Sequence, residues 1–371
     1  MLRLLVLATL SLLVFRHIAD YGAYDVLLFG ILLGLILLLE VLLTTKRLGS
    51  AQLWLFLVSI VAIYFVSLLK NGLGVGTLFL PLALACLGIA LQLNRDPQFY
   101  KAIWLMMVVV FAYHAVSILY FDMNPDDVVY GSKNHISTFY LSMTAAGYAL
   151  LARKSRRLPL APAVLCLVGC LLGQGSAGSV AGLVLFSGAL YAILLSRFPM
   201  QRFTLLLIAV PVVVLVLSIG LVDYSNALQS YLWNQGYSLE IMKRLDLPRI
   251  LGEDVRFEIW VSYIDRLDTR GLLLGFPFGA EFGFHENLHS SYLLLHQRGG
   301  VFSLLIFGFL IFILFELWKH SLVVFFCFLA LIVRAAGDTV FYGVGVFDWV
   351  LILCAVSVIN PSVSESRTAM K

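Results

Sequence analysis

The chain has 371 residues, of which 61% are hydrophobic and only 12% are charged, and its mean hydropathy is +0.97. About a quarter of the residues of a soluble domain are charged, so this composition excludes an ordinary soluble protein and indicates an integral membrane protein. The formal net charge of +4 is small and its placement follows membrane topology, so no nucleic-acid partner is expected. We therefore expect a single polytopic membrane domain, all-α, over residues 1–371.

In chain order, the expected transmembrane helices follow from apolar runs close to the roughly 20 residues that cross a hydrocarbon core. About twelve such runs are present, at residues 2–19, 23–43, 52–70, 77–93, 101–121, 136–152, 158–173, 175–195, 203–222, 300–318, 320–334 and 339–359. A long polar loop, residues 223–299, separates the ninth run from the tenth. Within it, residues 254–267 and 286–297 have apolar positions at helical spacing, which predicts short amphipathic helices at the membrane interface.

The distribution of basic residues predicts the orientation of these spans. One set of alternate loops holds 14 of the 25 Lys and Arg residues, the short loops of the other set hold 4, and the long loop holds the remaining 7. Cytoplasmic loops carry the excess of basic residues, and long loops are not counted in this rule. Both termini are therefore predicted to be cytoplasmic, and the long loop is predicted to lie outside.

The first candidate site is the histidine-rich segment HENLHSSYLLLHQRGG, which contains His285, His289 and His296. Their spacing places all three on one face if the segment is helical. A zinc site is conceivable, but the HExxH order is absent and no third protein ligand is evident, so no metal or other cofactor is expected. A single imidazole suffices for a general base or a substrate hydrogen bond. Interfacial histidines without a chemical role are the alternative.

The long loop also carries a cluster of basic residues. The planar guanidinium of arginine binds phosphate through two hydrogen bonds, so a diphosphate-linked lipid is a plausible partner. Acidic residues are interspersed in the same loop, and for any one arginine a surface ion pair is the alternative. The basic residues are Lys243, Arg244, Arg249, Arg256, Arg266, Arg270 and Arg298.

Further polar candidates lie between the fifth and sixth runs and inside the spans. Lys133, Asn134 and His135 offer sugar-hydroxyl or phosphate contacts where the chain re-enters the bilayer, although this segment also has the residues of a turn. Ionisable groups within spans are costly in lipid and should face the bundle interior, as expected for His114 and Asp348. Asp348, with Arg334 and Asp338 nearby in the sequence, belongs either to an internal structural pair, which is slightly favoured, or, in a transporter, to a proton-relay or substrate site.

Several motifs together resemble the O-antigen ligase and polymerase superfamily, over roughly residues 130–320. The most specific match begins with His289-Ser290, which nine residues separate from Gly300-Val301-Phe302-Ser303. This is similar to the family's pattern of His followed by Asn, Ser or Gln, then nine residues, then Gly-x-x. Ser303 departs from the Gly, Thr or Tyr that is usual at its position. RFEIW, with Arg256 and Trp260, looks like the family's Arg-x-x-x-Trp, and LLGFPFG and GSKNHIST also resemble family segments. The family's eighth span often opens with an arginine, which GQGSAGS lacks here; Lys133 or Arg266 would have to replace it.

The resemblance implies a GT-C-like helical bundle in a bacterial inner membrane that performs inverting, metal-independent glycosyl transfer at the periplasmic face. The donor would be a glycan on undecaprenyl diphosphate, with Arg256 binding the diphosphate and His289 accepting the proton of the acceptor hydroxyl. The remaining expected substrate contacts are Lys133, Asn134, His135, Trp260, Arg266, His285 and Arg298. A polymerase, which transfers the chain to the next lipid-linked repeat unit, is favoured over a ligase, which transfers it to lipid A-core. A chain-length regulator and a flippase are possible further partners.

A secondary transporter is the hypothesis from a different class. It predicts discontinuous helices and ionisable groups near the middle of the bilayer, for which His114, Asp348 and the glycines at 173–175 leave room. Most potentially reactive groups instead cluster in one long loop, and no matching halves are evident. The sequence therefore favours glycan transfer.

Overall fold

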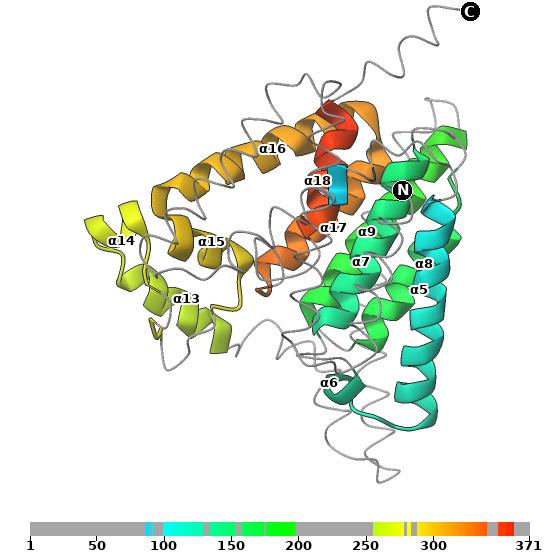
Figure 1. Cartoon of the computed structure of the whole chain (residues 1–371), viewed down its shortest axis with the longest axis horizontal. Helices are drawn as coiled ribbons and strands as arrows, with labels where there is room; N and C mark the ends of the chain where they lie inside the picture. Colours follow the sequence, from blue (N-terminus) through cyan, green and yellow to red (C-terminus); the bar gives the residue numbers. More distant parts are fainter. Residues whose placement is uncertain are drawn as a thin grey trace, which may run out of the picture.

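The computed structural model describes two helical parts of the chain and the segment that joins them (Figure 1). The described residues are 87–89, 91, 99–128, 134–152, 158–173, 176–197, 255–277, 280–282, 288–339 and 348–359. The first part is a bundle of α5 (Phe99–Ala115), α7 (Asn134–Leu151), α8 (Ala161–Leu172), α9 (Ser176–Arg197), α17 (Leu322–Ala336) and α18 (Asp348–Ile359). The second contains the loop helices α13 (Val255–Asp265) and α14 (Thr269–Leu274). Helices α15 (Ser291–Gly299) and α16 (Ser303–His320), with a 3-10 turn at Gly300–Phe302 between them, connect the two.

Among the described residues, three helical stretches are long and apolar enough to cross a membrane, which agrees with the expectation of a membrane protein. They are Phe99–Tyr120, Ala177–Leu195 and Ser291–His320. The first consists of α5 continued by a π-helical turn, Val116–Tyr120. Helices α7 and α9 are each one residue longer than the predicted runs at 136–152 and 175–195, whereas α8 and α16 are shorter than theirs. The runs at 2–19, 23–43, 52–70 and 203–222 lie outside the described residues.

Helix α7 is the centre of the bundle, since it packs against α5, α8, α9, α17 and α18. Almost all of its side chains are buried, including the polar Ser137, Thr138, Ser142 and Thr144. A helix that is surrounded by other helices can carry hydroxyl groups in a membrane, because they find partners inside the protein and not in lipid. Thr144 Oγ1, for example, donates to the carbonyl oxygen of Pro162 at 3.5 Å.

His114 faces the interior of this bundle, as predicted for an ionisable group in a span. Its side chain is fully buried, and Nδ1 lies 2.8 Å from the hydroxyl oxygen of Tyr140 on α7. Asp348, the other residue of that prediction, is the first residue of α18 and is half-buried.

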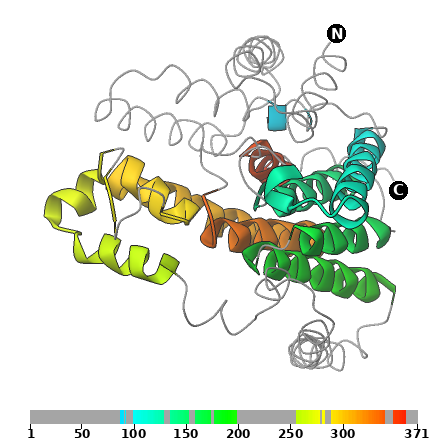
Figure 2. The same cartoon turned by 90° about the horizontal axis from the view of Figure 1, so that it is seen from below.

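The loop helices form a small hydrophobic core of their own. Its buried members are Ile259 and Tyr263 of α13 together with Phe282 and Leu288. This core lies beside α15, at the end of the bundle where α7 begins and α17 ends. We call this end the loop end (Figure 2). The loop helices are therefore anchored next to the polar residues that occupy this end of the bundle.

Candidate functional site

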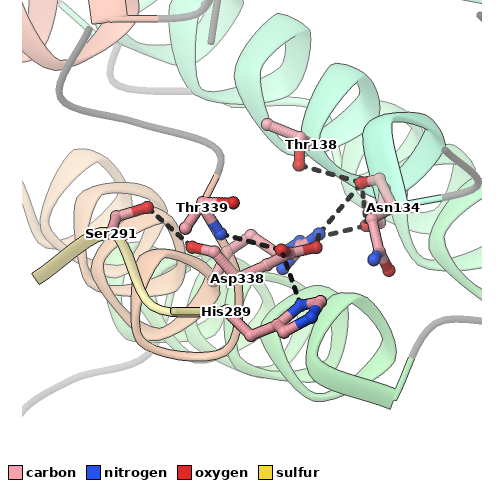
Figure 3. A network of polar contacts seen from close by, with 8 residues as sticks. Asn134, Thr138, His289, Ser291, Asp338 and Thr339 are labelled. Carbon is pink, nitrogen blue, oxygen red and sulfur yellow. Dashed lines mark hydrogen bonds and ion pairs between the residues drawn. The ribbon is translucent and has the colours of Figure 1, made fainter. Parts of the chain in front are cut away.

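A polar network at the loop end joins three segments that are far apart in the sequence (Figure 3). Asn134 and Ser137 come from the first turn of α7, and Arg334 comes from the last turn of α17. Asp338 follows α17, and His289 precedes α15. The network thus lies where the loop segment meets the membrane-spanning bundle.

Arg334 is the fully buried cation of this network. Its Nη2 donates to Asp338 Oδ2 at 3.2 Å and to the carbonyl oxygen of Asn134 at 3.0 Å. Its Nε donates to Ser137 Oγ at 3.2 Å. A buried guanidinium is tolerated only when an anion and hydrogen-bond acceptors replace its water, and Asp338 and α7 supply both. These bonds fix the end of α17 against the start of α7.

Asp338 connects Arg334 to His289. Its Oδ1 lies 3.7 Å from His289 Nδ1 and accepts the backbone N–H of Thr339 at 2.8 Å (Figure 3). Burial by itself would raise the pKa of Asp338, but its contact with His289, the charge of Arg334 and the N–H of Thr339 outweigh burial. The pKa of this carboxyl is therefore held below its usual range, and Asp338 is an anion at neutral pH.

His289 is held in an uncommon backbone conformation directly before α15. Its φ angle is 46°, in the left-handed region that non-glycine residues adopt only when their neighbours enforce it. The residues on both sides are held by hydrogen bonds. The carbonyl of Leu288 accepts a hydrogen bond from Trp260 Nε1 at 2.9 Å. Ser291 donates its backbone N–H and its hydroxyl to the backbone carbonyl of Asp338, at 3.0 and 2.6 Å. This turn aims the imidazole at Asp338.

The arrangement of His289 and Asp338 suits proton transfer. A carboxylate that faces Nδ1 favours the tautomer with the proton on Nδ1, which puts the basic lone pair on Nε2. The 3.7 Å separation is that of an ion pair, not of a short hydrogen bond, and such contacts often tighten only when substrate binds. About a third of the His289 side chain is exposed, whereas Asp338 is buried. A substrate can therefore approach the imidazole but not the carboxylate.

A second set of polar contacts holds the loop helices together. The hydroxyl of Tyr263 on α13 lies 2.7 Å from His296 Nδ1, and His296 Nε2 lies 3.1 Å from the carbonyl oxygen of Leu272 on α14. A carbonyl can only accept, so Nε2 carries the proton and Nδ1 accepts from Tyr263. Arg266 of α13 donates to the carbonyl of Glu281 at 2.6 Å. One histidine thus links α13, α14 and α15.

The prediction of one helix that contains both His289 and His296 is wrong. Residues 286–297 were expected to form one helix with both imidazoles on the same face, but α15 begins only at Ser291, after Ser290 in an extended conformation. His289 belongs to the bundle network, and His296 to the loop helices. The other expected helix of this loop, residues 254–267, is confirmed as α13, Val255–Asp265.

The remaining predicted site residues fall in several places. Asn134 belongs to the His289 network through its backbone carbonyl, His135 follows it and is half-buried, and Arg298 is buried on α15. Trp260 and Arg266 bond to backbone carbonyls of the loop segment. Arg256 belongs to α13, but its side chain is not described; Lys133 and His285 lie outside the described residues.

The sequence had not indicated that Asp338 would be the partner of His289. Asp348, with Arg334 and Asp338 nearby, was expected to belong to an internal structural pair or a transporter site, and the structure shows an ion pair of Arg334 with Asp338 at 3.2 Å. The available signal was the placement of both charges at the end of an apolar run, which marks residues that must find partners inside the protein. Their connection to the loop required the folded arrangement.

Among the described residues, no group of three or more His, Cys, Asp or Glu side chains is arranged to hold a metal ion. Comparisons of the chain with models of known protein families, with curated proteins and with solved structures found no match.

Proposed function

We propose that this protein is a membrane glycosyltransferase that uses a polyprenyl-diphosphate-linked glycan as donor, and specifically a polymerase of O-antigen type. The observation that carries the proposal is the pair of a partly exposed His289 and a buried, ionised Asp338 at the loop end of an apolar helix bundle. This is the location at which a lipid-linked sugar would present its diphosphate and its reducing end.

In this reaction His289 acts as the general base. The acceptor hydroxyl transfers its proton to Nε2 while its oxygen attacks the anomeric carbon of the donor sugar from the side opposite the diphosphate. The bond from that carbon to the diphosphate oxygen breaks, so the configuration inverts and the lipid diphosphate leaves. Asp338 stabilises the imidazolium that forms, because its carboxylate faces Nδ1. General base catalysis of this kind contributes a rate factor of about 10²–10⁴.

The leaving diphosphate requires cationic partners, and Arg256 and Arg298 are proposed for this role. Arg256 belongs to α13 and Arg298 to α15, the two helices that the Tyr263–His296 contact joins. In the proposal Arg256 binds the diphosphate and stabilises the charge that develops on it. Lys133, His135, Trp260, Arg266 and His285 remain proposed contacts of the glycan or of the second phosphate.

The proposal places the enzyme in a bacterial inner membrane, with both termini in the cytoplasm and the His289 site on the periplasmic side. Its substrates are two undecaprenyl-diphosphate-linked oligosaccharides, and a flippase and a chain-length regulator are proposed partners. A ligase that transfers the glycan to lipid A-core would use the same residues and differ only in its acceptor.

A secondary transporter is the second candidate, because Arg334 and Asp338 form a buried ion pair at the end of α17. Buried charge pairs in membrane helices often mark ion or proton pathways. The pair is joined to His289 from the loop and lies at the end of its helix, however, and not in the middle of a span. This position fits chemistry at a membrane surface better than a central transport site.

Electrophoresis of the surface glycan of a deletion strain, complemented with His289→Ala, tests the proposal. A polymerase predicts that the ladder collapses to core plus a single repeat unit, and a ligase predicts that lipid-linked polymer accumulates and no repeat reaches the core. His320→Ala is the matched control, because His320 is an exposed histidine at the opposite end of α16, and it should leave the ladder intact. A normal ladder in the deletion strain itself would favour the transporter.

A further inference from the structure

The short loop helix α14 exposes three consecutive leucines. Leu272, Leu273 and Leu274 are 53%, 47% and 45% exposed. The residues at the other end of the helix are polar: the Asp268 side chain accepts the backbone N–H of Gly271, and Arg270 is exposed. Polarity therefore changes along the axis of α14 and not around it, as expected of a helix that enters an apolar phase with its C-terminal end.

The leucines continue the exposed apolar surface of α16, which belongs to a membrane-spanning stretch. Helix α14 packs against the 3-10 turn Gly300–Phe302 that opens α16. At Gly300, φ is 53° and a Cβ atom would collide with the backbone of Leu273 and Leu274, so only glycine permits this approach. The adjoining exposed side chains are Val301, Phe302, Leu304 and Leu305.

The length of α16 is close to the thickness of a hydrocarbon layer. The 18 residues of α16 extend about 27 Å at 1.5 Å per residue, close to the roughly 30 Å of the hydrocarbon core. Trp318 and Lys319 lie near one end of this helix, and Phe302 and α14 lie at the other. When α16 crosses the layer from Trp318 to Phe302, the leucines of α14 lie at its edge, the region in which interfacial helices insert by about 5–10 Å.

The backbone at the C-terminal end of α14 is provided with internal hydrogen bonds. His296 Nε2 donates to the carbonyl of Leu272 at 3.1 Å, and the N–H of Gly275 bonds to the carbonyl of Gly271 at 2.8 Å. The N–H of Phe276 donates to the carbonyl of Gln297 at 3.0 Å. Lipid offers no hydrogen bonds, so backbone groups that enter it need partners from the protein. His296 supplies such a partner from outside the helix.

We propose that α14 is a membrane anchor of the loop: Leu272, Leu273 and Leu274 insert among the acyl chains of the leaflet on the loop side. Because α15 connects the loop helices to the bundle, this anchor holds them next to the His289 network. This inference does not depend on the proposed glycosyl transfer, because it follows from the continuity of α14 with the lipid-facing surface of α16.

Spin-label accessibility in the full-length protein, reconstituted in phosphatidylethanolamine–phosphatidylglycerol vesicles, tests the anchor. A label at Leu273→Cys is expected to collide more with oxygen, which partitions into lipid, than with a water-soluble nickel chelate. Asp265→Cys, on the exposed surface of α13, is the matched control and should show the reverse preference. Wild-type protein taken through the same labelling gives the background of the native cysteines, of which Cys166, Cys170, Cys327 and Cys354 are buried.

An oxygen-to-nickel ratio several-fold higher at Leu273→Cys than at Asp265→Cys is the expected result. Equal ratios would place α14 in water and overturn the anchor. Low collision rates with both reagents at Leu273→Cys would show that protein covers the leucines, which overturns it as well. Leu274→Cys repeats the measurement at a second exposed position, so that a single poorly folded variant does not decide the outcome.

Discussion

The ion pair of Arg334 and Asp338 holds the end of α17 against the start of α7, and its carboxylate also faces His289, the proposed base. Arg334 is fully buried, so Asp338→Ala leaves an uncompensated charge inside the protein. Loss of one partner of a buried pair costs about 3–5 kcal/mol, whereas replacement of both partners by apolar residues is often close to neutral. We therefore expect Asp338→Ala to lower the unfolding temperature of the purified protein strongly, and Arg334→Met/Asp338→Leu to recover most of this loss.

The double variant also separates stability from activity. Its fold should persist while glycan transfer is lost, because His289 then lacks the carboxylate that faces Nδ1. Thermal unfolding in detergent measures the stability of these variants, and the surface-glycan ladder measures their activity. A double variant that is stable and fully active would show that Asp338 has no part in the reaction.

At the scale of helices, close packing of α9 against α7 positions Ser137 for Arg334. A Cβ atom at Gly178 of α9 would collide with the Cβ and Oγ atoms of Ser137. Gly178→Ala must therefore push the two helices apart and weaken the bond from Arg334 Nε to Ser137 Oγ. We expect a loss of about 1–3 kcal/mol, as for other overpacked interiors, seen as a lower unfolding temperature.

Gly308→Ala on α16 is the matched control for this substitution. Gly308 is also a helical glycine, but no atom lies within 4 Å of a Cβ placed there. Alanine has the higher helix propensity by about 1 kcal/mol, so this variant should be as stable as wild type or slightly more stable. A similar loss in both variants would mean that the contact with Ser137 is not the cause.

Some helices could be predicted from the sequence and others could not. Apolar runs predicted α8 and α9 to within a few residues, because burial in a membrane demands long apolar segments whatever their neighbours are. The start of α15 was not predictable from spacing. The left-handed conformation of His289 depends on Leu288 and Ser291 being held by other segments. Helical periodicity alone would extend the helix through these residues.

Across the whole molecule, the arrangement of the helices depends on contacts that hydropathy does not encode. Helix α7 carries several hydroxyl groups, yet it is the most enclosed helix of the described bundle. Its position follows from small residues on its neighbours, such as Gly169 beneath the ring of Tyr140, and such pairings are visible only in the folded chain. The site has the same origin. His289 was predicted as a base from its motif, whereas Arg334 and Asp338 reach it only through the packing of α17 on α7.

In the proposed reaction, His289 removes the proton of the acceptor hydroxyl and Asp338 stabilises the resulting imidazolium. The most direct test is a transfer assay with purified protein in vesicles, given a single polyprenyl-diphosphate-linked repeat unit as donor and acceptor. Wild type is expected to form a product of two repeats with inversion at the new linkage. The transfer rate of His289→Ala should be lower by a factor of about 10²–10⁴, the usual contribution of a general base. The His320→Ala control should keep the wild-type rate. Full activity of a folded His289→Ala protein would contradict the role of His289 as the general base.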